Sequence, residues 1–180
     1  AIAGQLSKTG AGSAGFDFTK LDTNGNDLPA SASSWSCVRD NVTGLIWEIK
    51  TTNGDLHDTE GEYTYHNPNG TPSGAESGDS THAFVTAVNS QGLCGLNDWR
   101  LPTVQELRSL VDYSVPANGP SIDSNYFPNT ETQWYWSSTA LFKGSGEPSI
   151  LTVTFSDGDD GEEDVSIVIT NAARLVRSGQ

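Results

Sequence analysis

The sequence of 180 residues has no methionine, only two cysteines and few cations. Lys and Arg together number 9 against 23 Asp and Glu, so the formal net charge at pH 7 is −14. Nucleic acids, anionic lipid headgroups and sulfated polysaccharides are bound by clustered cations, and the charge balance therefore argues against these partners. The sequence also lacks a run of about 20 apolar residues, so no membrane span is predicted.

The missing methionine indicates a processed chain, because residue 1 is not an initiator. Ala1-Ile2-Ala3 is typical of the residues that follow a secretory cleavage site. We therefore expect an extracellular or cell-surface protein after removal of a signal peptide. In an exported protein the two cysteines, Cys37 and Cys94, are expected to form one disulfide, which stabilises by about 4 kcal/mol. The alternative is a pair of free thiols in a cytosolic protein.

The chain divides into an extended arm rich in Gly, Ala and Ser over residues 1–20 and a single domain over residues 21–180. A G-x-G-x-x-G pattern at residues 10–15 has no strand before it and no helix after it, so it does not predict a dinucleotide site. Ile2, Gly4 and Leu6 fall on one face of a run that can form a strand. We predict that residues 1–15 add to the sheet edge of a neighbouring copy.

Within the domain, hydrophobic periodicity predicts strands and helices in a mixed order. The predicted strands are 35–38, 45–49, 134–138, 150–155, 165–169 and 174–177. One helix is predicted over 81–91 with Gly92 as its stop, and another begins at Thr103 with a capping box to Glu106. Residues 51–80 are rich in Gly, Asn, Asp, Pro, Ser and Thr and are predicted as a long surface loop or an insertion.

Two segments are candidates for a metal site, and any metal is expected to be calcium because their ligands are oxygen atoms. The first is predicted as an acidic hairpin tip and contains Asp157, Asp159, Asp160, Glu162, Glu163 and Asp164. Carboxylates this dense require a cation or full solvation. The second, residues 22–27, is better interpreted as an Asn-Gly turn, with a calcium loop as the alternative.

The aromatic residues separate into two groups. Trp47, Trp99 and Trp136 fall inside strand or helix-entry motifs and are predicted to be core residues. A second group is less tied to such motifs and provides candidates for stacking on sugar rings or on another protein. This group comprises Trp35, Tyr63, Tyr65, Tyr126 and Trp134.

Four segments in order along the chain carry a family resemblance. They are CVRDNVTGLIWE at 37–48, CGLNDWRLPT at 94–103, a third spread over 122–139 with WYWSST at its end, and ARLVR at 173–177. Together they resemble the Lcl C-terminal domain family, named for a collagen-like bacterial adhesin. The family is similar to the C-type-lectin-like fold in the variant found in formylglycine-generating enzymes.

This resemblance implies an α+β, C-type-lectin-like domain with a twisted antiparallel sheet, two flanking helices, long loops and terminal strands close together. It also implies adhesion. Catalysis is not expected, because His57, His66 and His82 lack a zinc-protease spacing and no nucleophile elbow occurs.

Two functions remain open at this point. One is a surface subunit that acts by adhesion and self-association, as in a fibre or pilus-like structure, with itself as partner. The other is a lectin-like module that binds carbohydrate or a surface protein.

Overall fold

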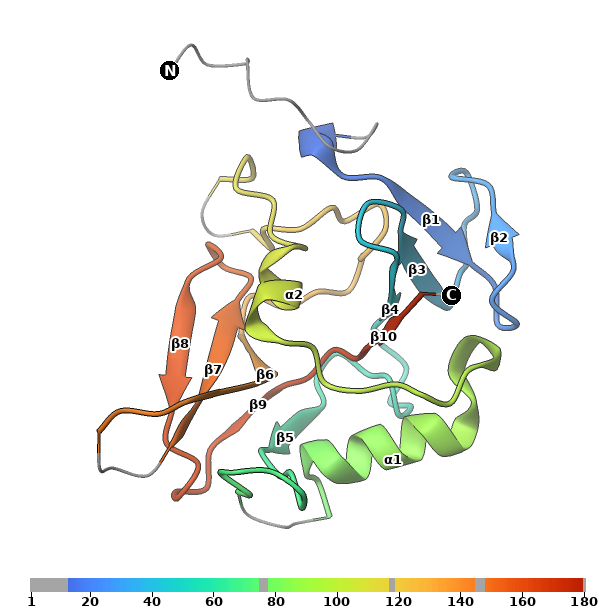
Figure 1. The fold of residues 1–180 in the computed structure, drawn as a ribbon. Helices are drawn as coiled ribbons and strands as arrows, with labels where there is room; N and C mark the ends of the chain where they lie inside the picture. The colour runs from blue at the N-terminus through green and yellow to red at the C-terminus, as the bar shows by residue number, and fades with distance from the viewer. Residues whose placement is uncertain (1–12, 75–77, 117–118, 145–147, 180) are drawn as a thin grey trace.

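A computed structural model describes residues 13–74, 78–116, 119–144 and 148–179, which form two five-stranded sheets and two α-helices (Figure 1). The first sheet has the order β10 (Val176–Ser178), β4 (Leu45–Glu48), β3 (Cys37–Asp40), β1 (Phe18–Leu21) and β2 (Asp27–Leu28). The second has the order β5 (Glu62–Thr64), β9 (Thr170–Ala172), β6 (Trp134–Leu141), β7 (Ser149–Thr154) and β8 (Asp160–Glu163). The α+β class is confirmed, with two sheets where one was expected.

The two sheets are joined by the residues between β9 and β10. The chain leaves the second sheet at Ala172 and enters the first at Val176, so Arg174 lies at the junction. Strands β1 and β10 belong to the same sheet, separated by β3 and β4. Strand β1 begins at Phe18, so it crosses the predicted boundary between the arm and the domain.

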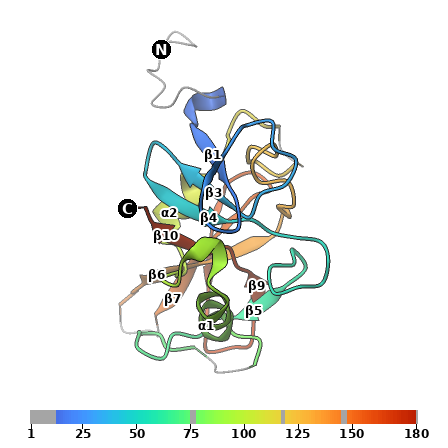
Figure 2. The same cartoon turned by 90° about the vertical axis from the view of Figure 1, so that its right-hand side faces the viewer.

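Helix α1 spans Thr81–Gln91, as predicted. The Ser80 hydroxyl accepts from the Ala83 N–H at its start, and Gly92 ends it in the left-handed region with φ 73°. Figure 2 views α1 nearly along its axis, with β5 and β9 beside it.

Helix α2 spans only Val104–Arg108, and the predicted capping box between Thr103 and Glu106 is confirmed. The chain leaves the helix at Ser109, while Leu110 and Val111 continue into the core. The short elements 13–15 (η1) and 93–95 (η2) are 3₁₀ turns.

The largest core cluster packs residues of both sheets and of α2, with Trp47, Phe127 and Tyr135 at most 1% exposed. Trp99 and Trp136 are 2% and 0% exposed, so the prediction of three core tryptophans is confirmed. The burial of such large side chains dominates the stabilisation of a fold with short strands.

Cys37 and Cys94 form the predicted disulfide, which links β3 to the 3₁₀ turn after α1. The turn at residues 22–27 lies against this link, since a Cβ atom at Gly25 would stand 2.8 Å from the Cys94 carbonyl oxygen. Gly25 also has φ 81°, a backbone conformation that favours glycine. The disulfide thus ties the first sheet to the α1 side of the molecule.

The strand predicted over residues 165–169 is wrong. The acidic residues before it form β8, and β9 begins only at Thr170. Asp160–Glu163 form a strand because their backbone pairs with β7. Ile167 and Val168 have no such pairing and are 58% and 77% exposed. The acidic segment is therefore partly strand, and only residues 155–159 form the hairpin tip.

Two other predictions hold in part. The final strand is shifted to Val176–Ser178, because Arg174 is used at the junction between the sheets. Residues 51–80 contain β5 and isolated bridges of 51 with 58, 64 with 80 and 66 with 74, within an otherwise irregular path.

Candidate functional site

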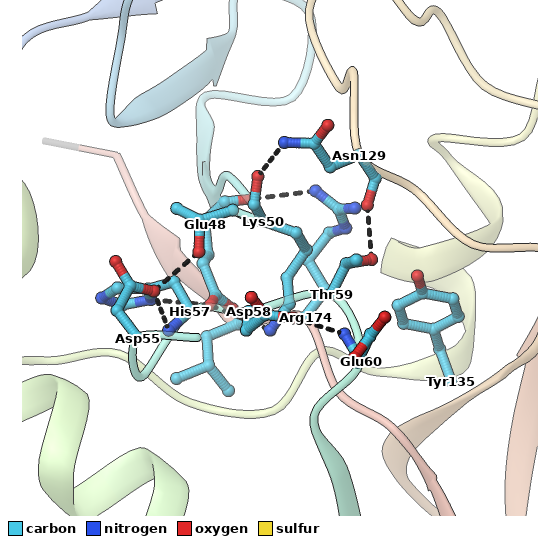
Figure 3. Close-up of polar contacts among 12 residues, drawn as sticks. Glu48, Lys50, Asp55, His57, Asp58, Thr59, Glu60, Asn129, Tyr135 and Arg174 are labelled. Carbon is cyan, nitrogen blue, oxygen red and sulfur yellow. Dashed lines mark hydrogen bonds and ion pairs between the residues drawn. The ribbon is translucent and has the colours of Figure 1, made fainter. Parts of the chain in front are cut away.

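A group of buried charged residues lies where the two sheets meet (Figure 3). Glu48, at the end of β4, is 0% exposed, and its Oε1 accepts from Lys50 Nζ at 3.3 Å and from His57 Nδ1 at 2.8 Å. Its other oxygen accepts from the Leu175 N–H at 2.8 Å. Each carboxylate oxygen therefore has a donor, which is the condition for burying this charge.

Arg174 belongs to the same group and is also 0% exposed. Its Nη1 donates to the Glu48 main-chain carbonyl at 2.9 Å, and its Nη2 donates to Thr130 Oγ1 at 2.8 Å. The guanidinium lies 5.2 Å from the Phe127 ring centroid and 6.0 Å from that of Tyr135. Arg174 thus bonds to the first sheet while it packs against aromatic residues of the core, and it holds the junction in place.

The pKa values in this group follow from burial and from the Glu48 charge. Burial alone would lower the pKa of His57, but its hydrogen bond and ion pair with Glu48 outweigh that effect and raise it. Burial would raise the pKa of Glu48, and the Lys50 charge and the His57 bond lower it instead. Burial lowers the pKa of Lys50, and Glu48 only partly opposes this. The network stabilises the His57 imidazolium.

His57 also lines a pocket of about 320 Å³ beside the disulfide. Its Nε2 lies 3.0 Å from Gln91 Oε1, so with Glu48 on the other side both ring nitrogens face acceptors. Asp55 lines the same pocket, and its carboxylate is held in place because Oδ1 accepts from Thr51 Oγ1 at 2.6 Å and from the His57 N–H at 2.8 Å. Trp35 also lines this pocket. An aromatic ring among hydroxyl, amide and carboxylate groups can receive a small polar ligand.

The predicted stacking residues are divided among three places. Trp35 and Tyr126 come together, because Trp35 Nε1 donates to the Tyr126 carbonyl at 3.0 Å and Lys20 Nζ lies 3.5 Å from the Trp35 ring centroid. Half-buried Tyr63 stacks on Phe84 at 4.4 Å in the second core cluster.

The other two belong to the second sheet. Tyr65 packs on Trp136 at 5.6 Å and is 4% exposed, so it is a core residue and not a ligand platform. Trp134 is half-buried on β6, and its ring lies against β8 at Gly161. Trp35 is thus the predicted stacking residue that lines the pocket beside the disulfide.

The acidic residues of the candidate calcium site do not converge. Asp160 pairs with Arg108 of α2 at 3.0 Å and Glu162 pairs with Lys143, while the carboxylates of Asp157 and Asp164 accept from nearby main-chain N–H groups. Across the described residues, no three His, Cys, Asp or Glu side chains form a group that could hold a metal ion. The alternation of side chains along β8 separates its carboxylates onto two faces.

The turn interpretation of residues 22–27 is confirmed. Asp22 Oδ1 accepts from the main-chain N–H groups of Asn24 and Asn26 at 2.8 and 2.9 Å, and Oδ2 accepts from the Asn26 side chain. These hydrogen bonds lower the pKa of Asp22 and use the carboxylate to close the turn between β1 and β2.

The predicted assembly residues Ile2, Gly4 and Leu6 lie outside the described residues. In the described part of the chain, the outermost strands of the two sheets are β10, β2, β5 and β8. Neither helix in the described ranges has the length and hydropathy needed to span a bilayer.

A family model for the Lcl C-terminal domain matches residues 36–177. This region contains strands β3 to β9, most of β10, both helices and the buried charged group. The chain belongs to the Lcl C-terminal domain family. No curated protein and no solved structure gives a significant match, so the C-type-lectin-like fold stays a prediction. Phe18–Leu21 and Asp27–Leu28, which complete the first sheet, precede the region matched to the family.

Sequence reasoning did not find the buried charged group. A signal was present, since Glu48 and Lys50 interrupt an apolar strand run and Arg174 lies between Ala173 and Leu175. Charged residues inside buried-strand patterns indicate paired interior charges. The pairing itself depends on how the two sheets pack, because Glu48 and Leu175 are 127 positions apart.

Proposed function

We propose that this domain is a non-enzymatic, extracellular bacterial surface protein that acts by adhesion and subunit association, as the structural subunit of a fibre or pilus-like assembly. The observation that carries the proposal is an open sheet edge. Strand β8 has a single neighbour, β7, among the described strands. An open edge offers main-chain hydrogen bonds to an added strand.

Two of the other edges are occupied within the domain. Val176 of β10 exchanges both main-chain hydrogen bonds with Arg100, at 3.0 Å each. On β5, Thr64 N donates to the Asp79 carbonyl at 3.0 Å. Strand β2 is only two residues long. Pairing by residues 1–15 of a neighbouring copy is therefore best accommodated at β8, which has four residues.

The buried polar groups support a structural and not a catalytic use. Glu48 and Arg174 bind main-chain atoms on both sides of the junction between the sheets. A carboxylate and a guanidinium committed to such bonds stabilise the fold and are not free to act on a substrate. Family membership and the disulfide fit a protein that works outside the cytoplasm.

Deletion of residues 1–15 tests this function. The intact chain should form linear or ring-shaped oligomers by light scattering and negative-stain imaging, whereas the deleted chain should remain a folded, disulfide-bonded monomer. Ser7→Ala serves as the matched control and should assemble as the intact chain does. A monomeric intact chain at high concentration, or unchanged assembly after the deletion, would contradict the proposal.

Ligand binding is a second candidate, favoured by the pocket that Trp35 and Asp55 line together. A sugar would stack on the Trp35 indole and bond to the Asp55 carboxylate, and the net charge of −14 favours a neutral ligand. Trp35→Ala should then abolish binding on a panel of neutral glycans, while Trp134→Ala should leave it unchanged. Equal binding by both variants would remove this candidate.

A further inference from the structure

We infer that β8 is the docking edge and that residues Ile2 to Leu6 of a neighbouring copy add to it as a strand. The inference rests on the proposed subunit association and identifies the surface that this association uses. Figure 1 shows β8 as the outermost strand of the second sheet, on the side away from β1, where the described chain begins. The β8 edge lies on the far side of the domain from the first described residues. If it receives the N-terminal segment of a neighbouring copy, the contact is head-to-tail and propagates into a fibre or closes into a ring.

The hydrogen-bond pattern of the hairpin shows which groups of β8 face outward. Thr154 N donates to the Asp159 carbonyl at 3.0 Å, and the pairing continues with Val153 opposite Asp160 and Leu151 opposite Glu162. In an antiparallel ladder hydrogen-bonded and non-hydrogen-bonded pairs alternate. The main-chain groups of Asp160 and Glu162 therefore point away from β7 and are available to an added strand.

The charges of the two segments are complementary. Strand β8 carries three carboxylates in four residues, and Asp164 follows it directly. Residues 1–15 contain Lys8 as their only charged side chain. In a chain with net charge −14, this acid-free segment is suited to lie along an acidic edge.

Exposed apolar side chains lie at the same end of the second sheet. Phe142 follows the end of β6, and Ile167 and Val168 follow β8, with exposures of 66%, 58% and 77%. The register joins these ends, since Leu141 lies opposite Ser149 and Ile150 lies opposite Glu163. Of these residues, Phe142 is next to Lys143, which pairs with Glu162 of β8, so Ile2 or Leu6 of a strand added to β8 could pack on the Phe142 ring.

Zero-length crosslinking between amines and carboxylates tests the contact with native residues. An equal mixture of ¹⁴N- and ¹⁵N-labelled intact chain would be crosslinked and digested for mass spectrometry. We expect mixed-isotope crosslinks from Lys8 to Asp160, Glu162, Glu163 or Asp164. The Lys143–Glu162 ion pair provides an internal control, because its crosslink should carry one isotope only. Lys8 crosslinks within one copy, or to the β2 edge, would overturn the inference.

Glu162→Pro tests the backbone contact, since proline removes the outward N–H without removing a bond to β7. We expect the concentration needed for assembly to rise at least about tenfold. Glu162→Ala loses the same ion pair but keeps the N–H, and it should assemble as the intact chain does. If deletion of residues 1–15 abolishes assembly while Glu162→Pro assembles normally with unchanged crosslinks, the docking edge is wrong and the subunit function stands.

Discussion

Glu48 and Glu162 are both glutamates on strands, and their surroundings are opposite. Glu48 is fully buried and receives hydrogen bonds from Lys50, His57 and the Leu175 main chain. Glu162 lies at an open edge and pairs with the exposed Lys143. One carboxylate is part of the connection between the sheets, whereas the other contributes to the charge of the surface.

The comparison shows that the net charge of −14 describes the surface and not the interior. The buried group contains two basic side chains, Lys50 and Arg174, and one carboxylate, Glu48. His57 adds a further positive charge when it is protonated. Loss of the one carboxylate in this group should therefore lower the free energy of unfolding far more than loss of any one surface carboxylate.

Glu48→Gln should have the largest effect. The change leaves Lys50 and Arg174 buried without an opposite charge, and we expect the free energy of unfolding to fall by about 3–5 kcal/mol. Urea denaturation at neutral pH measures this loss. Glu106→Gln on α2 is the control, because Glu106 is partly exposed, and it should lower the free energy of unfolding much less. Equal losses in the two variants would show that the buried Glu48 charge has no special weight.

His57→Asn should have an intermediate, pH-dependent effect of about 1.5–3 kcal/mol, the range for a hydrogen bond to a charged group. The pKa of His57 is raised above 6.5 in the fold, so the stabilisation is complete below pH 6.5 and is lost as pH rises through the folded-state pKa. Unfolding of both proteins at a series of pH values tests this. A stability difference that increases with pH would show that His57 is not charged in the fold.

Glu162→Gln should leave the free energy of unfolding unchanged, because its ion pair with Lys143 is exposed and salt screens it. Thermal unfolding at low and high salt provides the measurement. A large loss of stability would mean that β8 depends on its charges for its own folding, and the edge would then be less free to receive a neighbour.

The sequence by itself determined the elements whose signals are local. Helix α1 with its stop at Gly92, the capping box of α2, the turn closed by Asp22 and the three core tryptophans depend on neighbouring residues or on strong hydrophobicity. The signatures at residues 37–48 and 94–103 also identified the family.

Only the tertiary structure decided which strands pair and which charges meet. An acidic run became β8 because β7 supplied a ladder, whereas the more hydrophobic residues 165–169 were left outside the sheets. Tyr65 became a core residue because Trp136 packs on it. Arg174 meets Glu48 across 126 positions, and such contacts form only when two sheets pack, since local periodicity does not specify a partner that far along the chain.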